Sequence, residues 1–252
     1  MGLFCCKRKG KGGATEVGWL IDFDHASLIW EAPRVISRDL APPKSSKAAQ
    51  RCPAMGDLES RYFEVPCPVD FNLGFGRDEK NKPMLINRSG AMSSIAPGKL
   101  NELIRITPED RWRYPDKPII QISAPYRFIS EELVYMSQLP AFLHYYQPAL
   151  PGTLFCGRFP IDVWPRQLQW AFEWHDTSKD LVIKRGEPWF VLFFETTDPT
   201  KHIKLVEAEM TPELRQYCNG LDHVTGFVNK TFSLFKLAMK RRPKILLKKK
   251  DN

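Results

Sequence analysis

Histidine and carboxylate residues at two places in the chain have the spacing of metal ligands. Asp22 and Asp24 are two positions apart, so on a strand they would share one face, and His25 follows them. Glu173 and His175 have the same spacing. Because imidazole and carboxylate groups suit iron, manganese or zinc, Asp22, Asp24 and His175 are candidate metal ligands. Together with Glu173 in a β-sandwich, they would make a metal-dependent, cupin-like or oxygenase-like enzyme for a small polar substrate.

The complete ligand pattern of such an enzyme is missing from the sequence. There is no His-x-His pair followed by a spaced Glu and a distant His, and Asp176 directly follows His175, so the two would point to opposite sides of a strand. The chain also lacks a Gly-x-Ser-x-Gly nucleophile motif, a glycine-rich phosphate loop and a Cys-x-x-Cys pair. No motif therefore predicts a cofactor, and the metal-dependent enzyme is the alternative to a binding protein.

Aromatic and charged residues crowd the centre of the chain, where residues 153–196 hold four of the seven tryptophans. Aromatic faces stack on sugars or cations, and guanidinium groups bind carboxylates or phosphates. The centre is thus a candidate site for a polar small molecule or a carbohydrate. The competing interpretation is that tryptophans in strands fill the core. The candidate ligand-binding residues are Arg158, Trp164, Arg166, Glu173 and His175.

The net charge of +8 is located at the two ends of the chain. Residues 1–13 carry four basic residues and no acid, and residues 239–252 carry seven basic residues and one acid. The remainder has 26 basic and 28 acidic residues, so it is close to neutral. A neutral body argues against a nucleic-acid groove within the fold. Basic tails predict contact with an acidic surface, for which an anionic membrane and nucleic acid are both candidates.

The opening Met-Gly-Leu-Phe-Cys-Cys-Lys-Arg-Lys has the composition of a lipidated N-terminus. Gly2 is a candidate for acylation, and Cys5 and Cys6 are candidates for palmitoylation beside basic residues that favour anionic lipids. The acylation pattern departs at Cys6, where Ser or Thr is expected, and the other interpretation is a disordered basic start. Because the sequence shows no export signal and no apolar run of about 20 residues, we expect a cytoplasmic protein with reduced cysteines, peripheral to a membrane if lipidated.

Most elements that would position these residues are predicted to be strands. The segment 168–175 alternates between an apolar and a more polar face, which is typical of a strand with one buried side. Residues 189–194 are apolar throughout, which predicts a strand buried on both faces. The apolar face of the first segment consists of Leu168, Trp170, Phe172 and Trp174, and its other face of Gln169, Ala171, Glu173 and His175.

The rest of the chain before residue 211 is predicted to be short elements. Residues 130–138 fit either a helix or a strand. Further strands are expected at 19–21, 27–30, 61–75, 118–129, 159–164 and 181–183, helical segments at 97–104 and 107–110, and a long loop at 38–57.

The C-terminal part of the chain is predicted to be helical. Thr211, Pro212 and Glu213 supply a cap, a first-turn proline and an acid, and Asn219-Gly220 supplies a stop. A second helix is expected from Asp222 to Arg241. Its apolar face would consist of Val224, Phe227, Val228, Phe235 and Ala238.

These patterns predict a mainly β protein, an antiparallel sandwich of jelly-roll type with two C-terminal helices, or alternatively an α+β sheet with helices on one face. The expected divisions are a basic tail at 1–13, a β-rich core at 14–210, helices at 211–242 and a basic tail at 243–252. The favoured function is a non-enzymatic binding or structural module whose basic tails contact an acidic surface.

Overall fold

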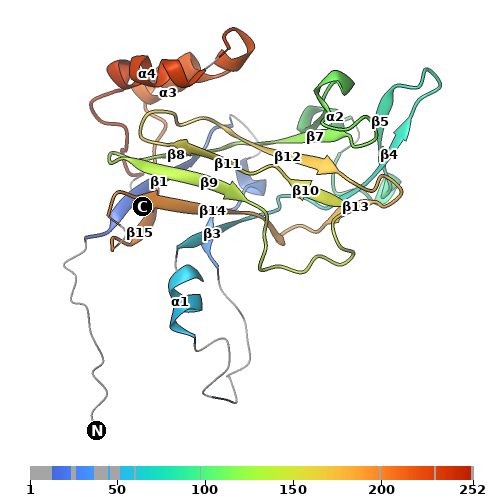
Figure 1. Ribbon diagram of the computed structural model, residues 1–252, viewed down its shortest axis with the longest axis horizontal. Helices are drawn as coiled ribbons and strands as arrows, with labels where there is room; N and C mark the ends of the chain where they lie inside the picture. The colour runs from blue at the N-terminus through green and yellow to red at the C-terminus, as the bar shows by residue number, and fades with distance from the viewer. Residues whose placement is uncertain are drawn as a thin grey trace.

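A computed structural model describes residues 13–23, 27–36, 45, 52–59, 61–96, 98–198, 200–229 and 231–250. The protein is mainly β, with several antiparallel sheets, and two of its helices lie near the C-terminus (Figure 1). The predicted sandwich-like fold with two C-terminal helices is therefore confirmed.

The described strands form four sheets, in which only the pair β1 and β15 is parallel. The first sheet has the order β15 (Ile203–Glu207), β1 (Thr15–Ile21) and β8 (Tyr126–Ile129). The second has β10 (Gly152–Leu154), β12 (Leu168–Trp174), β7 (Ile119–Ala124) and β6 (Ile104–Ile106). The third has β11 (Gly157–Pro160), β9 (Val134–Leu139), β14 (Pro188–Thr196), β3 (Tyr62–Pro66) and β2 (Arg34–Val35). The fourth has β13 (Leu181–Ile183), β4 (Phe71–Arg77) and β5 (Pro83–Asn87).

Two tryptophans join the second and third sheets across the core. Trp170 on β12 stacks on Trp189 of β14 with ring centroids 6.0 Å apart, and its indole nitrogen donates to the Trp189 carbonyl over 3.3 Å. The four apolar residues of β12 predicted to share a face are all buried, so this strand was predicted correctly. The indole N–H of Trp170 is satisfied by a backbone carbonyl, which lets so large a ring lie in the core.

Strand β14 is an inner strand of the third sheet, and its consecutive buried residues show that both of its faces are covered, as its apolar run predicts. It pairs with β9 along one edge and with β3 along the other. Its side chains from Trp189 to Leu192, and Phe194, are buried, while Phe193 is only partly buried and stacks on Tyr62 at 5.0 Å. The central stretch of the chain is therefore first of all the scaffold of the fold.

Several element predictions need correction in detail. Residues 27–30 are not a strand, because Ser27–Ile29 forms the 3-10 helix η1. The expected loop at 38–57 ends in helix α1 (Pro53–Glu59), and most of its other residues lie outside the described ranges. The strands expected at 61–75 and 118–129 are each two strands, separated at 67–70 and at Pro125 respectively. The strand expected at 159–164 corresponds to β11, which ends at Pro160.

The ambiguous segment 130–138 contributes to strand β9. The short helical predictions at 97–104 and 107–110 correspond to α2 (Leu100–Leu103) and η4 (Glu109–Arg111). A further 3-10 turn, η3, covers Gly90–Met92.

Helix α3 (Pro212–Leu221) begins as predicted, because the Thr211 hydroxyl accepts a hydrogen bond from the amide of Leu214 over 3.1 Å. The second predicted helix is wrong over its first half. His223 has a φ of 57°, which interrupts a helix, and 3-10 turns follow at η5 (Val224–Gly226) and η6 (Thr231–Leu234) before α4 (Phe235–Arg241). The expected apolar face fails there, since Phe227 is 88% exposed.

The segment after α4 lies against the body of the protein. The amide of Lys250 donates to the carbonyl of Glu207 over 3.0 Å, and Lys249 forms a bridge with Ala208 beside β15. Leu246 is buried, and the side chain of Leu247 occupies the space where a Cβ on Gly18 would lie. This segment therefore covers an edge of the first sheet, and it was not anticipated as an ordered element.

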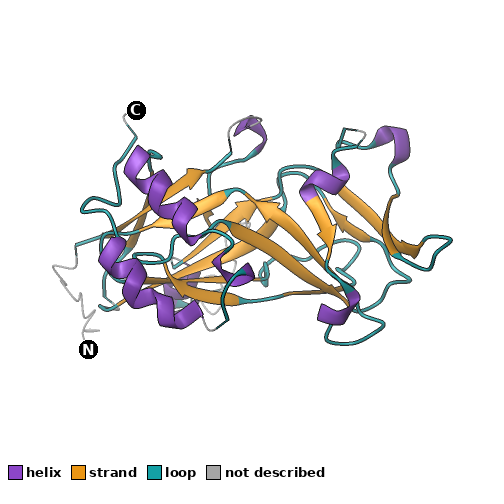
Figure 2. Cartoon of the chain, turned by 90° about the horizontal axis from the view of Figure 1, so that it is seen from above, coloured by secondary structure: helices purple, strands orange, loops and turns teal. Residues whose placement is uncertain are grey.

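Helices α3 and α4 lie together at one end of the molecule, and the β4–β5 hairpin projects from the opposite end (Figures 1 and 2). Among the described residues, no helix combines the length and apolar character needed to cross a bilayer.

Candidate functional site

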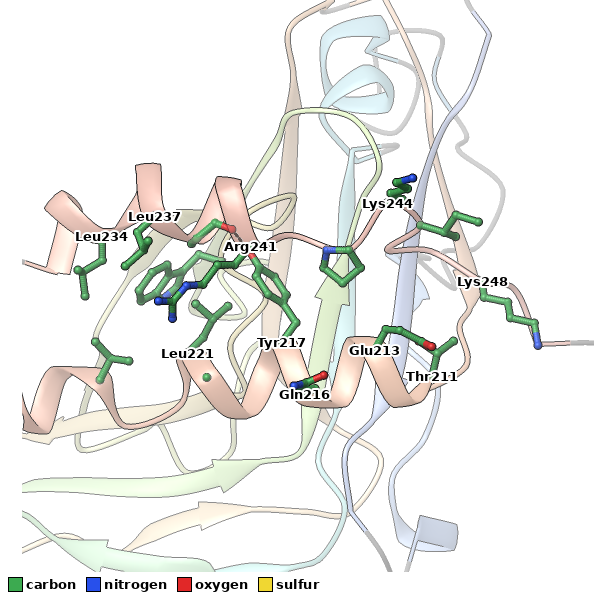
Figure 3. A pocket seen from close by; sticks show the side chains of 16 residues that line it. Thr211, Glu213, Gln216, Tyr217, Leu221, Leu234, Leu237, Arg241, Lys244 and Lys248 are labelled. Atoms are coloured by element: carbon green, nitrogen blue, oxygen red, sulfur yellow. Dashed lines mark hydrogen bonds between the residues drawn. The ribbon is translucent and has the colours of Figure 1, made fainter.

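A groove of about 880 Å³ lies between α3, α4 and the segment that follows α4 (Figure 3). This volume is in the range of roughly 300–1,000 Å³ typical of small-molecule sites. Trp164, Tyr217 and Ala238 line it and are buried, whereas Leu237 and Ile245 line it and are exposed. The groove thus has an apolar base and apolar lips.

Tyr217 fixes the base of the groove. Its hydroxyl lies 2.8 Å from the carbonyl of Val163 and 3.1 Å from the carbonyl of Ala238, so it connects α3 with the β-rich body and with α4. Burial raises the pKa of the Tyr217 hydroxyl to about 12, so it remains a proton donor at neutral pH. Beside it, the ring of Trp164 packs on Phe235 at 4.9 Å.

Positive charge gathers around this groove. Arg241 and Lys244 line it, and Lys236 and Lys240 lie four residues apart on α4, which places them on one face of the helix. All four are exposed, and none of them has an ion pair within the part of the chain that the structure describes. Figure 3 shows Arg241 extending into the space between the two helices.

Other cations near the C-terminus are neutralised. Arg242 pairs with Glu131 at 2.7 Å, and each of the three lysines at 248–250 has a carboxylate partner. The pairs are Lys248 with Glu209 at 2.6 Å, Lys249 with Glu16 at 2.7 Å and Lys250 with Glu207 at 2.6 Å. The unneutralised charge of the C-terminal region is therefore concentrated on and beside α4.

Exposed apolar side chains accompany this charge. Leu237 is 42% exposed, Met239 is 51% exposed and Ile245 is 68% exposed. Phe227 and Val228, in the segment between α3 and α4, are also exposed. We call the α4 surface the set Lys236, Leu237, Met239, Lys240, Arg241, Lys244 and Ile245.

The predicted metal ligand Asp22 forms ion pairs with two arginines. Its carboxylate pairs with the buried guanidinium of Arg127 and, at 3.4 Å, with Arg215. Asp24, the second predicted ligand, lies outside the described residues. The backbone amide of Asp22 donates to the carbonyl of Pro125. Pro125 directly follows Ala124, which pairs with Leu168 at the start of β12, so Asp22 lies near that end of the strand.

The third predicted metal ligand, His175, lies at the other end of β12. Leu168 and Glu173 are five positions apart along the strand, which corresponds to roughly 17 Å. The structure therefore does not bring Asp22 together with His175 and Glu173. Among the described residues, no group of three or more metal-ligating side chains forms.

Glu173 and His175 do form a pair. The Nε2 atom of His175 lies 3.1 Å from Oε2 of Glu173 and 3.3 Å from the hydroxyl of Thr153. Glu173 is 4% exposed, and its Oε1 atom has no hydrogen-bond partner, with the guanidinium of Arg113 at 3.8 Å. This is a buried carboxylate in contact with an exposed imidazole and near a cation, on the polar face predicted for this strand.

The other predicted ligand-binding residues lie elsewhere. Arg158 on β11 pairs with Glu195 at 2.6 Å and lies over the ring of Tyr135 at 3.8 Å. Arg166 is exposed in the segment before β12. Only Trp164 contributes to the groove. The lipidation candidates Gly2, Cys5 and Cys6 lie outside the described residues.

Sequence reasoning missed the groove because its walls come together only through the fold. A local signal existed: between residues 234 and 248, apolar residues are interspersed with lysines and arginines, which is typical of an interfacial segment. No protein-family model, curated protein or solved structure matches this chain, so the function has to be argued from its own residues.

Proposed function

We propose that this protein is a non-enzymatic binding module that docks on an anionic membrane surface through the α4 surface. The observation that carries the proposal is the combination of four cations without ion pairs among the described residues and exposed Leu237, Met239 and Ile245 beside them. Each cation near an anionic bilayer contributes about 1 kcal/mol of binding free energy, and apolar side chains add to it by entering the headgroup boundary.

A membrane fits this surface better than nucleic acid does. Phosphate backbones attract cations, but they leave exposed leucine, methionine and isoleucine side chains in water. A bilayer accepts both, because lysine and arginine stems can lie along the interface while their charges reach the headgroups.

The N-terminus would add a second membrane signal. An acyl chain on Gly2, or palmitoylation at Cys5 or Cys6, would act together with the α4 surface, because one lipid chain alone binds membranes only marginally. The proposal does not depend on that modification, since the α4 surface is present in the unmodified chain.

The test is flotation of the full chain with vesicles of phosphatidylcholine alone and of an equimolar mixture of phosphatidylcholine and phosphatidylserine. We expect binding only to the anionic vesicles, weakened by salt because the attraction is electrostatic. The double variant Lys236→Glu/Lys240→Glu reverses two charges on the outer face of α4 and should weaken binding at least tenfold.

The matched control is Lys80→Glu/Lys82→Glu, which makes the same charge change on the hairpin at the opposite end of the molecule (Figure 1). It should bind within twofold of the unmodified protein. Equal loss in both double variants would show that net charge alone drives binding. Binding to a duplex DNA probe but not to anionic vesicles would overturn the proposal in favour of nucleic acid.

A further inference from the structure

We propose that the groove between α3 and α4 accepts one acyl chain of an anionic phospholipid, with its phosphate held by Arg241. The inference rests on the proposed function, because the lipid comes from the surface on which α4 docks. It adds a defined ligand site to a surface contact.

The lining of the groove fits an alkyl chain. Its base is formed by the rings of Trp164 and Tyr217 and by Ala238, and the only polar group of Tyr217 is already hydrogen bonded to two carbonyls. A polar ligand would therefore find few groups to bind along the base, whereas a hydrocarbon chain would exclude water from apolar surface.

The lips of the groove fit the same ligand. Leu237 and Ile245 line the groove and are 42% and 68% exposed, so they leave apolar area in water that a lipid chain would cover. Both belong to the α4 surface, which faces the membrane in the proposed function. A chain that enters the groove from the bilayer would therefore contact these two apolar side chains.

Arg241 matches the phosphate. It lines the groove, extends between the helices (Figure 3) and has no ion pair within the described residues. A guanidinium group binds phosphate through two parallel hydrogen bonds, a geometry that lysine does not offer. Glu213 also lines the groove, but Arg241 and Lys244 outweigh its charge, so the groove favours an anion.

Gly220 gives a way to fill the groove without disturbing the backbone. It lines the groove, and a Cβ at this position would meet no atom within 4 Å. Its φ is not in the left-handed region, so a larger residue continues the helix without strain. Gly220→Trp therefore places an indole in the groove, and Asn219→Trp, at an exposed neighbouring position that does not line it, is the matched control.

The test uses the full chain and monomeric octyl, decyl and dodecyl phosphate, so that no lipid surface is present. Isothermal titration calorimetry should show one site, with affinity rising about fourfold for each added CH₂ group. Dodecyl maltoside, which lacks the charge, should bind at least tenfold more weakly than dodecyl phosphate.

The variants separate the two parts of the site. Gly220→Trp should abolish binding of dodecyl phosphate, and Asn219→Trp should leave it within twofold. Arg241→Gln should weaken dodecyl phosphate at least tenfold and change dodecyl maltoside less than twofold. Because Arg241 is exposed, this variant keeps the test valid even if Gly220→Trp fails to fold.

Three results would overturn the inference: no binding of dodecyl phosphate, equal binding by Gly220→Trp, or binding of dodecanoate at least as tight as that of dodecyl phosphate. These results are distinct from failure of the proposed function, which is measured with vesicles and with Lys236 and Lys240, neither of which lines the groove. If the chain binds anionic vesicles but not dodecyl phosphate, the proposed membrane contact stands and the proposed acyl-chain site in the groove is wrong.

Discussion

The guanidinium of Arg127 is buried against the carboxylate of Asp222, with Nη1 of Arg127 at 3.1 Å from Oδ1 of Asp222 and Nη2 also hydrogen bonded to that carboxylate. Arg127 lies on β8, and Asp222 follows the last residue of α3, so this pair attaches the C-terminal helices to the first sheet. The same guanidinium pairs with Asp22 after β1 and donates to the carbonyl of Pro165.

Replacing Arg127 with methionine should strongly destabilise the protein. The variant keeps a similar side-chain volume but leaves Asp22 and Asp222 partly buried without their cation. Removing one partner of a buried ion pair costs about 3–5 kcal/mol, and the lower end applies here because both carboxylates retain some solvent contact. Urea unfolding followed by tryptophan fluorescence measures the change.

Arg215→Ala is the control for that measurement, because Arg215 also pairs with Asp22 but is exposed. Its effect on the free energy of unfolding should stay below about 1 kcal/mol. Equal losses for the two variants would mean that the buried position of Arg127 does not matter.

The C-terminal segment should detach as the pH falls, because Glu131 holds it. The Glu131 carboxylate accepts hydrogen bonds from the amides of Leu246 at 2.6 Å and Leu247 at 2.8 Å, and from Arg242 at 2.7 Å. Burial raises the pKa of Glu131, but the bonds from Leu247, Arg242 and Leu246 outweigh it and bring the pKa below its ordinary value of 4.5. A lowered pKa gives stability that is present above pH 4.5 and is lost as the pH falls through the folded-state value.

Hydrogen exchange of the Leu246 and Leu247 amides, expressed relative to their intrinsic rates, checks this. Protection should be constant above pH 5 and fall below pH 4.5, and Glu131→Gln should lower it about tenfold at neutral pH, since a bond to a charged acceptor contributes about 1.5 kcal/mol. An unchanged protection in Glu131→Gln would show that the burial of Leu246 alone holds the segment.

How far the fold could be predicted depends on whether the decisive contact is local. The alternation of residues 168–174 is a property of neighbouring positions, so the buried face of β12 was predicted residue by residue. The second C-terminal helix was predicted from local apolar spacing, but Asp222 is the C-cap of α3, with its carboxylate bound by Arg127, and His223 turns the chain into the left-handed region.

The charge state of the surface at residues 243–250 also depends on contacts that are remote along the chain, so it could not be predicted from local sequence. Lys248, Lys249 and Lys250 read as free cations in the sequence, because their partners Glu209, Glu16 and Glu207 are remote along the chain. The candidate site was therefore only partly foreseen: Trp164 was named, but the α4 surface depends on which cations the fold neutralises, and that is decided by tertiary contacts.

The two predicted metal positions should not bind a shared ion. Asp22 is held by two guanidinium groups, and roughly 17 Å of strand separates its end of β12 from the end that carries Glu173 and His175. After incubation with iron, manganese or zinc and desalting, elemental analysis should find well under one equivalent per chain, both for the unmodified protein and for His175→Ala. One equivalent that His175→Ala removes would restore the metal-dependent enzyme as the better hypothesis.

Tyr217→Phe should loosen α4 while leaving the rest of the fold in place. The phenylalanine ring keeps the packing of Tyr217, but the carbonyls of Val163 and Ala238 lose their shared donor in a buried setting. Leaving buried acceptors unsatisfied costs about 1–3 kcal/mol. The loss should appear first as faster hydrogen exchange in residues 235–241, with the strands of the second and third sheets unaffected, because Tyr217 belongs to the separate apolar cluster under the helices. Faster exchange throughout β12 and β14 as well would contradict this, since it would mean that the helices and the sandwich unfold as one unit.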